Sequence, residues 1–180
     1  MITDAFVVPL KRFDFAKTRL RHDGATGIDE LARELAAAVI DSCRPRHVIV
    51  LSESDDVTAF AIDRGAEVVR SEATSLNEAV QRAYGLLAAR FDRLIIAHGD
   101  LRFPAGLGGF ETGPGVTIVT DHHGRGTNVL ALSTGLDFHF AYGDDSATRH
   151  RDEATRLGLD VALVTDSPWC YDVDEPRDRE

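Results

Sequence analysis

Two lysines stand close together after the first apolar run of this sequence. Lys11 and Lys17 fall in "VPLKRFDFAKTRL", and they are the only lysines among the 20 basic residues of the 180-residue chain. A lysine ammonium is a compact positive charge that suits a polyphosphate. The chain carries a net charge of −10, so local cations would have to attract such an anion. The alternative is that the pair is an accident of an arginine-rich composition.

Three aspartates form a second candidate group. Asp100 ends "RLIIAHGD", and Asp172 and Asp174 fall in "WCYDVD". Side chains two residues apart share one face of an extended segment, so Asp172 and Asp174 can act together. Carboxylate oxygens suit Mg²⁺, which takes further ligands from water and substrate phosphates. Taken singly, each aspartate could be a turn or capping residue.

A third group could bind a phosphate or a carboxylate. Gly126, Thr127 and Asn128 precede or begin an apolar run, and Gly143 and Ser146 stand before a predicted helix. Their backbone N–H groups and hydroxyls are donors of the kind that cradle phosphate, and a helix N-terminus attracts anions. Taken alone, "GRGTN" could be an ordinary turn.

The apolar runs around these groups predict an α/β protein. Runs rich in Val, Ile and Leu alternate with amphipathic helical patterns over residues 5–103. Strands without polar alternation are buried on both faces, which is typical of a mostly parallel sheet in a three-layer sandwich. Later strands crowd together, which predicts a mixed sheet with a hairpin around residues 116–132. Ligands of open α/β sheets bind at the carboxyl ends of strands, where the candidate groups fall.

Local signals give the boundaries of the predicted elements. Thr26 or Asp29 is expected to cap the first helix and Ser146 the last, and residues 104–115 are expected to form a surface loop. "WCYDVD" is a candidate eighth strand. The predicted strands are 5–8, 47–52, 66–71, 93–100, 115–120, 128–133 and 160–165, and the predicted helices are 26–43, 54–65, 75–91 and 146–158.

Composition narrows the class of protein. The apolar fraction is 43%, and no apolar run reaches the roughly 18 residues that span a bilayer. We expect one domain over residues 1–180, without a secretory signal. Cys43 and Cys170 show no metal or redox spacing, which favours a cytoplasmic protein. The acidic balance disfavours nucleic-acid binding, and an oligomer stays open.

Taken in order, these motifs resemble the phospholactate guanylyltransferase family of coenzyme F-420 biosynthesis. The resemblance extends over residues 5–178. Arg102 after "GDL" and Thr120 before "DHHG" depart from the family pattern, in which proline is expected. Both departures bear on the acceptor rather than on the nucleotide. The matching stretches are "VPLKRFDFAKTRL", "SLNEAV", "HGDL", "DHHGRGTNVLAL", "FAYGDDSATRHRDEA" and "DVDEPRD".

The resemblance implies a nucleotidyltransferase fold like that of the GT-A glycosyltransferases. It implies Mg²⁺-dependent transfer of GMP from GTP to 2-phospholactate, phosphoenolpyruvate or 3-phosphoglycerate. Lys17 and Asp100 would be catalytic. By the same resemblance, Lys11, Lys17 and Arg19 would bind the triphosphate, Asn77 the nucleoside, Asp100, Asp172 and Asp174 the Mg²⁺, and Thr127, Gly143 and Ser146 the acceptor.

Two other functions stay open. The first is a nucleotidyltransferase of the same fold that uses another acceptor, such as molybdopterin or a sugar phosphate. The second is a non-catalytic GTP-binding protein, which would bind the nucleotide without releasing pyrophosphate. The choice of guanine over other bases rests on the resemblance alone.

Overall fold

A seven-stranded mixed sheet organises the described part of the chain, with strand order β3-β2-β1-β4-β6-β5-β7. The computed structural model describes residues 3–16 and 26–173. Strand β6 runs antiparallel to both neighbours, whereas the other neighbouring pairs are parallel, so the predicted mixed sheet and its hairpin are confirmed. The strands are β1 (Asp4–Pro9), β2 (His47–Ser52), β3 (Glu67–Arg70), β4 (Arg93–Ala97), β5 (Val116–Thr120), β6 (Thr127–Ser133) and β7 (Val161–Val164).

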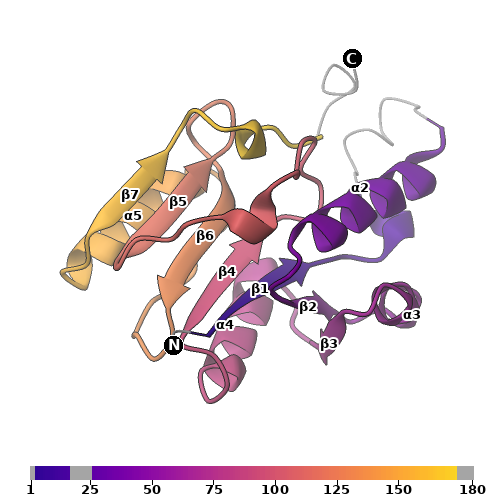
Figure 1. Cartoon of the computed structure of the whole chain (residues 1–180), viewed down its shortest axis with the longest axis horizontal. Helices are drawn as coiled ribbons and strands as arrows, with labels where there is room; N and C mark the ends of the chain where they lie inside the picture. Colours follow the sequence, from indigo (N-terminus) through magenta and orange to yellow (C-terminus); the bar gives the residue numbers. More distant parts are fainter. Residues whose placement is uncertain (1–2, 17–25, 174–180) are drawn as a thin grey trace.

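Helices cover both faces of the sheet, as Figure 1 shows. In β1, Phe6 and Val8 pack with α2 and α3, whereas Ala5 and Val7 pack on the other face with α4 and α5. This alternation within a fully buried strand confirms the predicted three-layer sandwich. Every helix in the described ranges is too short or too polar to traverse a bilayer. The α-helices are α2 (Ile28–Ser42), α3 (Asp55–Asp63), α4 (Leu76–Leu87) and α5 (Ser146–Arg156).

Two of the predicted helix caps are wrong. The N-cap of α2 is Gly27, whose φ of 69° turns the chain into the helix without a side-chain cap, so neither Thr26 nor Asp29 is the N-cap residue. The N-cap of α5 is Asp145, with φ 55°, and Ser146 is already the first helical residue. Glycine adopts left-handed backbone without a steric penalty, and aspartate is one of the few other residues that tolerate it.

The segment of residues 104–115 is more buried than a surface loop. It contains a short 3-10 helix (Leu107–Gly109), and Leu107 and Phe110 are buried in the core. A Cβ on Gly108 would lie 1.9 Å from the carbonyl oxygen of Arg44, so this glycine permits close backbone contact. The candidate eighth strand is instead a 3-10 helix (Pro168–Cys170) followed by a single bridge between Leu101 and Asp172.

Candidate active site

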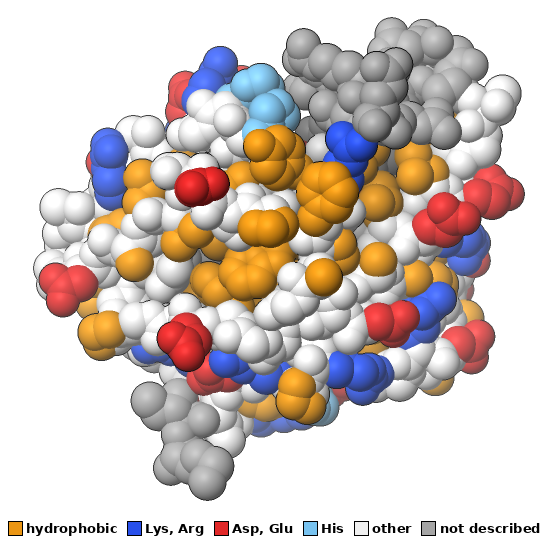
Figure 2. Space-filling view, turned by 45° about the horizontal axis from the view of Figure 1, so that its top comes forward, with side chains coloured by type: hydrophobic (Ala, Val, Ile, Leu, Met, Phe, Trp, Pro, Cys, Tyr) orange, Lys and Arg blue, Asp and Glu red, His pale blue; other side chains and the backbone are white. Residues whose placement is uncertain are grey.

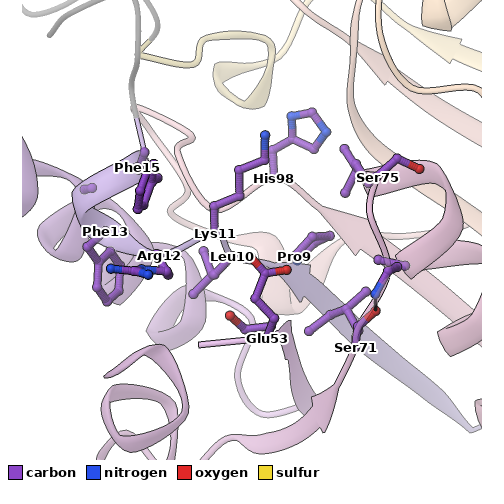
Figure 3. A pocket seen from close by; sticks show the side chains of 18 of the residues that line it. Pro9, Leu10, Lys11, Arg12, Phe13, Phe15, Glu53, Ser71, Ser75 and His98 are labelled. Carbon is purple, nitrogen blue, oxygen red and sulfur yellow. Dashed lines mark hydrogen bonds between the residues drawn. The ribbon is translucent and has the colours of Figure 1, made fainter. Parts of the chain in front are cut away.

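The carboxyl ends of β1, β2 and β4 border a cavity of about 680 Å³. Its walls include the loops after these three strands, together with Ser71 and residues 73–76, which lead into α4. Figure 3 shows Lys11 and His98 on one side of the cavity, Ser71 and Ser75 on another, and Glu53 between them. A cavity of this volume at this edge of an open α/β sheet has the size and position of a ligand site.

Lys11 and Asp100 line the same cavity because two strand-end loops approach each other closely. The Leu10 N–H donates to the Leu51 carbonyl over 2.9 Å, which extends the β1–β2 pairing to the loop. A Cβ on Gly99 would lie 2.2 Å from Cδ2 of Leu10, so any side chain there would displace Leu10. The sequence predicted that Lys11 and Asp100 would meet, because both follow the carboxyl ends of strands in the same sheet. Gly99 is the residue that permits this close approach.

Asp100 and Asp172 lie on neighbouring backbones, although they are far apart in the sequence. The Val173 N–H donates to the Asp100 carbonyl over 3.1 Å, and the Arg102 N–H donates to the Tyr171 carbonyl over 2.8 Å. These two bonds flank the antiparallel bridge between Leu101 and Asp172. The structure therefore brings together the backbones of two of the three predicted metal ligands, with Asp172 opposite Leu101 and Asp100 opposite Val173.

The chemistry of these two side chains suits a hard divalent cation. Asp100 and Asp172 would supply carboxylate oxygens, and Mg²⁺ commonly takes one or two protein carboxylates and completes its shell with water and phosphate oxygens. Residues 3–16 and 26–173 contain no group of three or more His, Cys, Asp or Glu that could hold a metal ion. The third predicted ligand, Asp174, lies outside the described residues, as do Lys17 and Arg19.

Asn77 contacts the backbone of a distant segment with both ends of its amide. Its Nδ2 donates to the Tyr142 carbonyl over 3.1 Å, and its Oδ1 accepts from the Tyr142 N–H over 2.6 Å. One turn further along α4, the amide of Gln81 makes the same pair of contacts with Phe138 and Phe140. Asn77 thus links α4, whose first turn borders the cavity, to the segment that contains Gly143, and its predicted contact with the nucleoside stays a prediction.

The three predicted acceptor residues gather around the beginning of α5. The Ser146 N–H donates to the Gly143 carbonyl over 3.2 Å, and Gly143 itself has φ 120°. The Ala147 N–H donates to the Arg125 carbonyl over 2.9 Å, so two first-turn donors of α5 already have protein partners. The helix dipole still favours an anion here, although fewer free N–H groups remain than the sequence suggested.

Thr127 is tied to α5 through a buried histidine. Its Oγ1 lies 3.0 Å from Nδ1 of His150, and Nε2 of His150 accepts from the Ala141 N–H over 3.0 Å. Burial, and then the charge of His98, lowers the pKa of His150 to about 4, so the ring is neutral at pH 7. Since Nε2 accepts, the single ring proton sits on Nδ1 and is donated to Thr127.

A column of rings connects the cavity with the residues that the sequence predicts to bind the acceptor. His98 and Tyr142 have ring centroids 5.4 Å apart, and Tyr142 and His150 have centroids 4.8 Å apart. Burial raises the pKa of Tyr142. Nε2 of His98 is buried and has no hydrogen-bond partner within the described ranges. The two halves of the candidate site are therefore packed against each other and are not separated by solvent.

An aromatic patch borders the segment that carries Asp172. We define it as Phe103, His122 and Tyr171, with ring centroids of Phe103 and Tyr171 6.2 Å apart and of His122 and Tyr171 5.7 Å apart. Phe103 and Tyr171 are each 47% exposed. Figure 2 shows hydrophobic side chains gathered beside histidines on this face of the molecule. Phe103 and Tyr171 line a second cavity, and none of the three patch residues lines the cavity at the strand ends.

Sequence reasoning missed three residues of this region. Glu53 lines the cavity, Gln81 binds the extended segment before Gly143, and His150 holds Thr127. Glu53 had an available signal, because it directly follows the predicted strand 47–52. The contacts of Gln81 and His150 depend on tertiary packing and leave no local pattern.

The order of the strands and the cavity at their carboxyl ends define an α/β protein with the fold of nucleotide-diphospho-sugar transferases. A solved structure from Desulfovibrio desulfuricans, described as such a transferase, has a TM-score of 0.75 and 16% sequence identity to this chain. The match covers 97% of this chain and 84% of that one. At this identity the likeness shows the fold alone.

A family model described as "Guanylyl transferase CofC like" matches residues 4–180, and the chain belongs to this family. A relative from Chloroflexus aggregans, named phosphoenolpyruvate guanylyltransferase, is 31% identical, with 93% of this chain and 91% of the relative covered. A relative from Methanothermobacter thermautotrophicus, named 2-phospho-L-lactate guanylyltransferase, is 27% identical, with 96% of this chain and 80% of the relative covered. Relatives with different acceptors in their names thus resemble this chain at similar levels.

Proposed function

We propose that this protein is a guanylyltransferase that joins GMP from GTP to a small phosphorylated acid and releases pyrophosphate. The candidate acceptors are 2-phospholactate, phosphoenolpyruvate and 3-phosphoglycerate, and the pathway is coenzyme F-420 biosynthesis in the cytoplasm. The observation that carries this proposal is the cavity shared by Lys11 and Asp100, in a chain whose family match spans residues 4–180.

The proposed reaction joins two anions. A phosphate oxygen of the acceptor attacks the α-phosphorus of GTP, a new P–O bond forms, and the bond to the bridging oxygen breaks as pyrophosphate leaves with the electron pair. The acceptor phosphate is already nucleophilic, so no general base is required. The protein has to position the two substrates and offset their charge.

Each part of the site has a role in this reaction. The Lys11 ammonium would lie against the triphosphate, with Lys17 and Arg19 assigned the same role from the sequence. Asp100 and Asp172, with Asp174, would hold Mg²⁺. When bound, Mg²⁺ would neutralise charge that develops on the phosphates. Thr127, Gly143 and Ser146 would bind the acid, and Asn77 would keep the Gly143 segment at the correct distance from the nucleotide.

A direct assay tests the proposal. Pyrophosphate release is measured for the purified protein with each of the four NTPs, in all combinations with the three candidate acids and with a sugar phosphate as the alternative acceptor. We expect turnover that requires GTP, one of the acids and Mg²⁺. Binding of GTP without pyrophosphate release for any acceptor would instead indicate a non-catalytic GTP-binding protein.

A further inference from the structure

Glu53 is an acidic side chain in a cavity proposed to bind a polyphosphate, and this placement needs an explanation. The acidic residues among those that line the cavity are Glu53 and Asp100. Asp100 has a proposed role beside Asp172, but Glu53 has none. A carboxylate repels phosphate, so it would weaken nucleotide binding unless a hydrogen-bond donor of the ligand faces it.

The backbone around Glu53 is held by hydrogen bonds, whereas its carboxylate interacts with Arg12 only through the charge of that side chain at longer range. Arg70 Nη2 donates to the Glu53 carbonyl over 3.0 Å, and Ser54 both donates its N–H to Ser52 Oγ and caps α3. Within the described ranges the Glu53 carboxylate makes no hydrogen bond or ion pair. Figure 3 shows it directed into the cavity. The neighbouring Arg12 is paired with Asp14 over 2.6 Å.

The position of Glu53 matches the far end of a bound nucleotide. Strands β2 and β4 are separated by β1, so their carboxyl ends lie two strand spacings apart, or roughly 10 Å. Asp100 follows β4, Lys11 follows β1 and Glu53 follows β2. A nucleotide with its phosphates beside Lys11 and Asp100 would therefore place its base beside Glu53.

We infer that the Glu53 carboxylate selects guanine by accepting hydrogen bonds from its N1–H and its exocyclic amino group. This inference rests on the proposed function. Guanine presents these two donors side by side, and a carboxylate presents two acceptor oxygens in a matching geometry. Adenine presents a ring-nitrogen acceptor at the same position and would be repelled.

The other polar side chains near Glu53 cannot make this distinction as strictly. Ser75 Oγ accepts from the Glu78 N–H as the cap of α4, and Ser71 Oγ accepts from the Ala73 N–H. A hydroxyl can donate or accept and so adapts to either base, whereas an ionised carboxylate only accepts. A site built to bind a donor rejects a ligand without one, because its acceptor would lose its partner.

Inosine triphosphate lacks only the exocyclic amino group of GTP and is the probe for this contact. Values of kcat/KM for pyrophosphate release are compared for GTP and ITP in the wild type, Glu53→Ala and Glu53→Gln. Glu72→Ala is the matched control, because it removes an equal charge beside the cavity from a residue that does not line it. A hydrogen bond to a charged group corresponds to roughly a 10- to 100-fold preference for GTP in the wild type.

We expect this preference to fall to near one in Glu53→Ala, to fall partly in Glu53→Gln, and to persist in Glu72→Ala. A Glu53→Ala variant that keeps the wild-type preference overturns the inference. The inference is also overturned if Glu53→Ala loses a preference for GTP over 2′-deoxy-GTP but keeps the preference for GTP over ITP. Glu53 would then bind the ribose. If the wild type turns over no acceptor, the proposed function fails, and calorimetric titration of GTP and ITP into the same variants still tests Glu53.

Discussion

The amide of Asn77 binds Tyr142 at both its carbonyl and its N–H, over 3.1 Å and 2.6 Å, across 65 residues of sequence. Asn77 lies in the first turn of α4, beside the wall of the cavity, and Tyr142 immediately precedes Gly143. This pair of hydrogen bonds ties the wall of the cavity to the segment that leads to Gly143. If the proposed subsites are correct, Asn77 would connect both substrates without direct contact with either.

Replacing Asn77 should show whether its contacts position the acceptor or only stabilise the fold. Asn77→Ala leaves two backbone groups of Tyr142 without partners, which costs about 1–3 kcal/mol in unfolding free energy. We expect it also to raise the KM for the acceptor. Gln81→Ala is the matched control, because it removes the equivalent contacts to Phe138 and Phe140, further from Gly143. Urea unfolding and acceptor titrations measure both effects, and equal acceptor KM values in the two variants would contradict the positioning role.

The carboxylates of Asp100, Asp172 and Asp174 should be essential for turnover but not for folding. Asp100→Asn or Asp172→Asn should lower kcat by a factor of about 10²–10³, because a positioned charge that stabilises the reacting phosphates is lost. Asp174→Asn should behave alike, as the sequence predicts. Removal of divalent cations with EDTA should abolish wild-type turnover, and added Mg²⁺ should restore it.

Asp63→Asn, an exposed carboxylate at the end of α3, is the control for this set. It should retain full activity. All variants should keep the wild-type melting temperature within a few degrees. Near wild-type kcat in Asp172→Asn would show that the Leu101–Asp172 ladder has only a structural role.

Lys11 should matter more for GTP than for the acceptor. Lys11→Ala removes a charge-assisted contact to the triphosphate, and we expect the KM for GTP to rise by a factor of about 10. Arg12→Ala should have a smaller effect, since its guanidinium is paired with Asp14. Initial rates at varied GTP and fixed acceptor provide the measurement. A larger change in the acceptor KM than in the GTP KM would indicate that Lys11 binds the acceptor and not the triphosphate.

His150 should make the protein less stable as the pH falls through a defined window. The folded pKa of His150 is lowered to about 4 by burial, whereas an unfolded histidine has a pKa of about 6.5. Between these values the unfolded chain binds the extra proton, so unfolding free energy decreases as pH falls from about 6.5 to about 4. The total loss is on the order of 3 kcal/mol.

The pH window separates this effect from the acidic side chains. Hydrogen bonds from Arg90 and Arg156 lower the pKa values of Glu67 and Glu153, respectively, to about 2. The stabilisation that these two carboxylates give the protein is therefore lost only as the pH falls below about 4.5. His150→Gln should flatten the curve above that pH, whereas His123→Gln, an exposed control, should not. Denaturant titrations at half-unit pH steps test this. An unchanged slope in His150→Gln would mean that another group titrates there.

Sequence alone determined the layers of this protein and the edge at which its chemistry gathers. Apolar runs without polar alternation can only be buried on both faces, and their boundaries agree with the observed strands to within a few residues. Because parallel strands end at one edge, Lys11 and Asp100 were expected to meet, and they line one cavity. These features are local or follow from topology, so a single sequence carries them.

Tertiary structure decided which side chains hold which segments. The contacts of Asn77 with Tyr142, of Thr127 with His150, and of Leu101 with Asp172 join residues that no periodic pattern relates. The left-handed N-caps at Gly27 and Asp145 likewise replaced the predicted side-chain caps. Such contacts form only once the helices have packed on the sheet, because their geometry depends on distances that the folded core sets.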